Sequence, residues 1–133
     1  NFNFINSYGD YMVLQQAGKD QQKSTINGIS KYTSDQVTLK LSTMSDKNTI
    51  LQTKTATVTN DVWQIILDPV ATSNTAYYIV AQSKVNASDM VSLSNVLFGD
   101  VFVCGGQSNM QFTVDQVFNA SEALEEANNY PNI

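Results

Sequence analysis

Residues 96–112 read Val-Leu-Phe-Gly-Asp-Val-Phe-Val-Cys-Gly-Gly-Gln-Ser-Asn-Met-Gln-Phe, and they divide the chain into two kinds of sequence. The apolar run from Val101 to Cys104 has no polar alternation, which is typical of a strand buried on both faces of a parallel sheet. Gly105-Gly106 follows, and glycines let the backbone turn sharply because they carry no Cβ. The pattern predicts a buried strand that ends in a polar turn, Gln107-Ser108-Asn109.

Ser108 lies on this predicted turn, at the carboxyl end of a strand, where open α/β sheets build their sites. A serine in such a place is a nucleophile if a general base lies beside it and N–H groups face the oxyanion. The same serine could instead be the N-cap of a following helix. The nucleophile elbow of α/β-hydrolases, Gly-x-Ser-x-Gly, is not matched, because Met110 stands in place of the second glycine.

The same stretch resembles the nucleophile block of the sialate O-acetylesterase family, which are carbohydrate esterases of the SGNH-hydrolase superfamily. The resemblance is carried by Leu97-Phe98-Gly99-Asp100-Val101, by Cys104 and by Gly106-Gln107-Ser108-Asn109-Met110. Further segments support it, namely residues 10–15, 61–63, 67–69 and 116–120. The likeness covers only the N-terminal portion of the family.

The resemblance implies an esterase that removes acetyl groups from O-acetylated sialic acid or a related acetylated sugar, in the lysosome or outside the cell. It implies that Ser108 is the nucleophile, whose Oγ would attack the acetyl carbonyl. It gives Gln107 and Asn109 a supporting role, in positioning the turn or in lending a side-chain amide to the oxyanion. It implies no metal and no cofactor.

The chain contains no histidine. A serine esterase needs a general base that works near neutral pH, and histidine is the usual one. We therefore expect the His and Asp of the site to come from a C-terminal hydrolase portion outside these 133 residues. A single strand, turn and helix also cannot cover both faces of a buried strand, so we expect the hydrolase domain to be incomplete in this chain.

Residues 1–97 predict an antiparallel β module. Residues 37–41 and 63–67 place apolar side chains at every second position, which is the period of a strand with one buried face. Further strands are expected at residues 11–15, 50–59, 75–82 and 91–97. Several short strands separated by turn signals are typical of an all-β sandwich or barrel.

Beyond the serine turn the apolar spacing changes to that of a helix. Asn119 followed by Glu122 matches a capping box, and the pattern predicts a helix over residues 120–128. The predicted fold class is therefore mixed, with an all-β sandwich-like module over residues 1–97. Residues 98–133 would then be the first strand, turn and helix of an α/β hydrolase domain of the SGNH type.

A second function stays open, in which the protein is a carbohydrate-binding or interaction module without catalysis. Trp63 could stack on a sugar ring in such a module. It alternates in phase with Ile65 and Leu67, however, which favours a place in the core.

Composition narrows the classes of partner. A formal charge of −5 with only seven basic residues gives no electrostatic footprint for nucleic acid or an anionic membrane. No apolar run is long enough for a membrane span. The sequons Asn86-Ala87-Ser88 and Asn119-Ala120-Ser121 make Asn86 and Asn119 glycosylation candidates and fit the secretory route. Cys104, the only cysteine, is expected to be a small core residue or to pair with a cysteine elsewhere.

Overall fold

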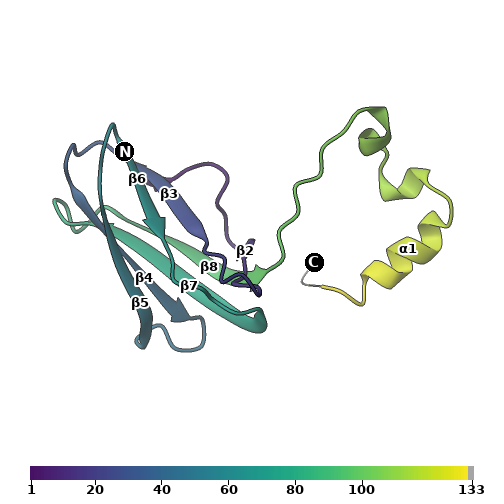
Figure 1. The fold of residues 1–133 in the computed structure, drawn as a ribbon, viewed down its shortest axis with the longest axis horizontal. Coiled ribbons are helices and arrows are strands. Elements are labelled where there is room, and N and C mark those ends of the chain that lie inside the picture. Colours follow the sequence, from purple (N-terminus) through teal and green to yellow (C-terminus); the bar gives the residue numbers. More distant parts are fainter. Residues whose placement is uncertain (132–133) are drawn as a thin grey trace. The chain divides into compact units, whose positions relative to one another are not determined.

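The protein was analysed as a computed structural model, which describes residues 1–131. The chain divides into two compact units, one of residues 1–101 and a second that begins at Phe102. Among the described residues, eight strands lie in the first unit and one α-helix lies in the second (Figure 1). The fold is therefore mostly β, with two sheets and one short C-terminal helix.

The first unit contains a three-stranded and a five-stranded sheet. The smaller sheet is antiparallel, with the order β1-β3-β6, and comprises β1 (Phe2–Phe4), β3 (Thr25–Ser30) and β6 (Val62–Ile66). The larger sheet has the order β2-β8-β7-β4-β5 and comprises β2 (Val13–Gln15), β8 (Met90–Gly99), β7 (Ser73–Ser83), β4 (Gln36–Thr43) and β5 (Ile50–Thr57). Its strands are antiparallel except for the pair β2 and β8, which is parallel.

The alternating pattern of the sequence correctly predicted which side chains are buried. In β4, Val37, Leu39 and Leu41 point into the core, and no more than 1% of each is exposed. In and after β6, Trp63 and Leu67 are equally buried. One hydrophobic cluster unites residues of both sheets, so the two sheets stabilise each other by removing a common apolar surface from water.

Trp63 occupies the centre of the smaller sheet's packing. Its ring stacks on Phe2, with 6.0 Å between the ring centroids, and meets the edge of Phe4 at 5.6 Å. Its indole N–H donates to the carbonyl of Ile29 at 3.3 Å. A Cβ atom on Gly28 would lie 2.0 Å from Cζ2 of the indole, so only glycine lets the ring pack so closely on β3.

Asp35 is a buried carboxylate that links the loop before β4 to the turn after β7. The hydroxyl of Ser83 donates to its Oδ2 at 2.5 Å, and the backbone N–H of Val85 donates to its Oδ1 at 3.0 Å. Only 2% of Asp35 is exposed. These bonds satisfy the carboxylate and fasten the start of β4 to the turn between β7 and β8.

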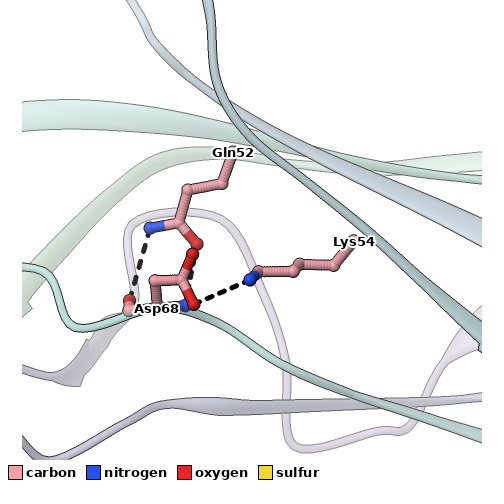
Figure 2. A network of polar contacts seen from close by, with 3 residues as sticks. All are labelled: Gln52, Lys54 and Asp68. Carbon is pink, nitrogen blue, oxygen red and sulfur yellow. Dashed lines mark hydrogen bonds and ion pairs between the residues drawn. The ribbon is translucent and has the colours of Figure 1, made fainter.

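A polar network joins β5 to Asp68, the second residue after β6 (Figure 2). The side chain of Gln52 accepts the backbone N–H of Asp68 at 2.8 Å and donates to its carbonyl at 3.3 Å. The ammonium of Lys54 lies 2.7 Å from the carboxylate of Asp68. Because β5 and β6 belong to different sheets, the network ties the two sheets together at their edge.

The second unit is built from short helical turns. Two 3-10 helices, η1 (Ser108–Gln111) and η2 (Val114–Gln116), precede α1 (Ala120–Ala127). The predicted helix over residues 120–128 is thus confirmed to within one residue. Within residues 1–131, no helix is both long enough and apolar enough to cross a membrane.

Candidate functional site

The prediction that Val101 to Cys104 form a buried strand is wrong. These residues are exposed and belong to no strand, with Phe102 82% and Val103 98% exposed. A strand buried on both faces needs a hydrogen-bonding neighbour and covering helices. No segment among the described residues pairs with this run, so its backbone stays extended and its apolar side chains stay in contact with solvent. Cys104 is likewise exposed rather than a core residue.

Ser108 is the first residue of η1, and its side chain is exposed. The N-cap of this helix is Gln107, which makes no side-chain capping bond, so Ser108 is not a capping residue. The backbone N–H of Met110 donates to the carbonyl of Gln107 at 2.8 Å and closes the turn. The first N–H groups of a helix have no acceptor within it, so the N–H of Ser108 is available to an oxyanion.

The two glycines before the serine have different roles. Neither adopts a left-handed conformation, since Gly18 is the one glycine with positive φ in the described part of the chain. A Cβ on Gly106 would lie 2.6 Å from Cγ of Met110, whereas a Cβ on Gly105 would meet nothing within 4 Å. A side chain at position 106 would therefore require the exposed Met110 side chain to shift, whereas one at position 105 would not.

Gln107 and Asn109 flank the serine, and both are exposed. Across residues 1–131, the side chains of Gln107, Ser108 and Asn109 make no hydrogen bonds with other residues. The structure thus presents three unpaired polar side chains on one turn. The turn carries an exposed serine hydroxyl beside a backbone N–H donor, and the sequence has no histidine, which is the usual base of a serine esterase.

The predicted capping box at Asn119 and Glu122 is wrong. Asn119 adopts the left-handed conformation, with φ 60° and ψ 27°, and makes no side-chain capping bond. Asparagine tolerates this conformation better than most residues. The reciprocal bonds of a capping box occur instead between Thr113 and Gln116 at η2. Thr-x-x-Gln is itself a capping-box sequence, so this box could have been found from the sequence.

The two sequon asparagines have different surroundings. Asn119 is exposed, next to the fully exposed side chain of Phe118. Asn86 is partly buried in the turn between β7 and β8. Its side-chain oxygen accepts the backbone N–H of Ser88 at 3.2 Å, and its amide nitrogen lies 3.4 Å from the hydroxyl of Tyr32.

The first unit contains an open hollow that the sequence analysis did not identify. It has a volume of about 470 Å³ and lies between the loop after β1 and the start of β8. Its lining includes Asn3, Asn6, Tyr8, Asp10 and Ser92. The segment 1–10 contains several polar residues among its aromatic ones, and these were the signal in the sequence. They could not be assigned to a hollow from the sequence, because the rest of the lining comes from β8.

In the described part of the chain, no group of three or more His, Cys, Asp or Glu side chains is close enough together to bind a metal ion. Trp63 is 1% exposed, which confirms its predicted place in the core and removes it as a platform for a sugar.

Comparison with known proteins relates this chain to the sialate O-acetylesterases of several mammals. No protein-family model matches the chain. The chain is 31% identical over 133 residues to the sialate O-acetylesterase of Mus musculus and 31% identical over 134 residues to that of Rattus norvegicus. It is 30% identical over 133 residues to that of Homo sapiens. Each match covers 99% of this chain and 23% or 24% of the relative, so the chain spans about a quarter of the length of the curated relatives it matches.

Proposed function

Because the chain is homologous to the N-terminal quarter of the sialate O-acetylesterases, we propose that it is part of a serine esterase that hydrolyses O-acetyl esters of sialic acids. The observation that carries the proposal is the similarity over nearly the whole chain, which includes the serine turn as well as the β unit. Ser108 is the nucleophile, and Gln107 and Asn109 support it.

The proposed chemistry is acyl transfer. The Oγ of Ser108 attacks the carbonyl carbon of the acetyl group while a base accepts the hydroxyl proton. The carbonyl oxygen becomes an oxyanion, which the backbone N–H of Ser108 and the amide of Gln107 or Asn109 can stabilise. The sugar oxygen then leaves with a proton, and water hydrolyses the acetyl-serine to acetate and free enzyme. The exposed, unpaired state of these side chains supports the proposal, because a nucleophile must be reachable.

The base and its orienting carboxylate come from a C-terminal hydrolase portion that supplies His and Asp. The absence of histidine from these 133 residues supports this, as do the exposed apolar side chains of the second unit. Phe102, Val103 and Phe118 are at least 82% exposed, which leaves apolar surface that further polypeptide could cover.

The protein would act in the lysosome or outside the cell. This part of the proposal depends on the sequons at Asn86 and Asn119, whose asparagines both lie on turns or at the end of a helix rather than within the core.

Acetate release tests the proposal. The chain joined to a C-terminal hydrolase portion is expected to release acetate from 9-O-acetyl-N-acetylneuraminic acid, and Ser108→Ala should lower kcat by at least about a thousandfold. Ser7→Ala, a change at another exposed serine, serves as the matched control and should leave the rate unchanged. Activity of Ser108→Ala within a few fold of the parent protein would show that Ser108 is not the nucleophile.

A further inference from the structure

We propose that the first unit binds a neutral sugar residue in the hollow beside Tyr8. This inference uses only residues 1–101 and does not depend on the proposed esterase activity. The volume of about 470 Å³ lies within the range of small-ligand pockets, which is about 300 to 1,000 Å³. The hollow is open, as a site for one residue at the end of a glycan would have to be.

The floor of the hollow is rigid. Phe4 and Leu93 line it and are 6% and 3% exposed, so the core fixes both side chains. The hydroxyl of Tyr8 donates to the carbonyl of Thr25 at 2.8 Å and lies 3.3 Å from the amide nitrogen of Asn27. A ligand would meet these side chains already held in place, without the cost of ordering them first.

The rim of the hollow is polar and lies in solvent. It carries the amides of Asn3 and Asn6, the hydroxyl of Ser92 and the carboxylate of Asp10. Asp10 is held in place because its Oδ1 accepts the backbone N–H of Ser94 at 2.7 Å. Its second oxygen can then accept from a ligand hydroxyl. Sugar hydroxyls both donate and accept, which matches a rim of amide, hydroxyl and carboxylate groups.

Charge selects a neutral sugar over an acidic one. Asp10 is the one charged side chain in the lining of the hollow, and the whole chain has a formal charge of −5. An anionic sugar would bring a second negative charge close to this carboxylate, which is unfavourable. A divalent cation is usually bound by several oxygen ligands that include more than one carboxylate, and Asp10 is the one carboxylate here, so the hollow does not fit such a cation.

Nuclear magnetic resonance titration of the whole 133-residue chain tests the proposal. The probes are the methyl glycosides of glucose, galactose, mannose and N-acetylglucosamine, with N-acetylneuraminic acid as the acidic comparison. At least one neutral glycoside is expected to shift the amide signals of Asn6, Gly9, Asp10 and Leu93 saturably, at concentrations on the order of 10 mM or less. The proposal is wrong if no neutral glycoside moves these signals, or if only the acidic sugar does.

Two variants make the test specific. A Cβ on Gly9 would meet nothing within 4 Å, so Gly9→Leu fits the backbone and places its side chain at the hollow, and it should weaken binding at least about tenfold. Asp10→Asn keeps an acceptor for the N–H of Ser94 but removes the charge, and should weaken binding about threefold to tenfold. Ala71→Leu, in an exposed loop, is the matched control and should bind like the parent chain.

The spectra of the variants also report whether each protein is folded. Unchanged affinity in a folded Gly9→Leu protein, or tighter binding by Asp10→Asn, would overturn the proposal.

Discussion

Gly28 has the strictest steric requirement among the glycines of the described chain. Replacement by alanine would put a Cβ 2.0 Å from the indole of Trp63 and 2.5 Å from the backbone oxygen of Asn3. Since neither neighbour is a flexible side-chain end, we expect Gly28→Ala to lower the free energy of unfolding by about 3 kcal/mol or more. Urea denaturation followed by Trp63 fluorescence measures the change.

Gly9→Ala is the matched control, because a Cβ there meets nothing within 4 Å, and it should change stability by no more than about 0.5 kcal/mol. Equal midpoints for the two variants would contradict the account of how Trp63 packs.

Asp35 gives a second prediction for a single residue. Asp35→Ala removes the acceptor of the Ser83 hydroxyl and of the Val85 N–H inside the protein, which should cost about 2 to 3 kcal/mol. Hydrogen exchange gives a specific readout, because the amide of Val85 should lose its protection first. Asp20→Ala, at an exposed carboxylate, should leave both stability and exchange unchanged. Continued protection of Val85 in Asp35→Ala would show that the carboxylate does not hold the turn.

Residue by residue, the sequence predicted what depends on local pattern. Trp63 was placed in the core because it alternates with Ile65 and Leu67. The need for Gly28 could not be predicted, because it arises from Trp63, which is distant in sequence and reaches Gly28 only through the pairing of β3 with β6. The capping role of Asn119 was predicted wrongly. The residue matches the capping motif, but its backbone adopts the left-handed conformation and its side chain makes no capping bond.

At the level of elements, the link between β5 and the end of β6 contains two kinds of contact, hydrogen bonds and an ion pair, whose contributions to stability can be compared. Gln52 makes two hydrogen bonds to the backbone of Asp68, and we expect Gln52→Ala to cost about 1 kcal/mol. Lys54 makes only an ion pair with the partly exposed Asp68 carboxylate, and solvent screens it. Lys54→Ala should therefore cost no more than about 0.5 kcal/mol, with even less effect in high salt.

Thermal unfolding of the two variants at low and high salt provides the comparison. A larger loss for Lys54→Ala than for Gln52→Ala would reverse the order expected from the geometry.

Among the elements, β4, β6 and α1 were predicted well because each shows its period clearly in the sequence. The strand at residues 101–104 was not found, although its apolar run is just as clear. A half-buried strand needs one partner surface, which this chain provides for β4 and β6, whereas α1 forms without burying any of its residues. A strand buried on both faces depends on several other elements, and a local pattern cannot show whether they are present.

For the molecule as a whole, the sequence predicted a β unit followed by a different kind of segment. The structure confirms the mostly β fold with two sheets. The serine turn was located from its motif, but a local motif cannot show whether Ser108 is reactive, because the proposed reaction needs a base and the sequence has no histidine. The hollow beside Tyr8 was missed because its lining comes from segments more than 80 residues apart.

The reactivity of Ser108 in the presence of the remaining hydrolase portion tests the central claim most directly. We would treat the joined protein with a fluorophosphonate and locate the adduct by peptide mass spectrometry. The account predicts one adduct, on Ser108, and little or no labelling of the 133-residue chain alone, because no base is present there to activate the hydroxyl. An adduct on a different serine, or a joined protein that is folded and active but unlabelled at Ser108, would contradict it.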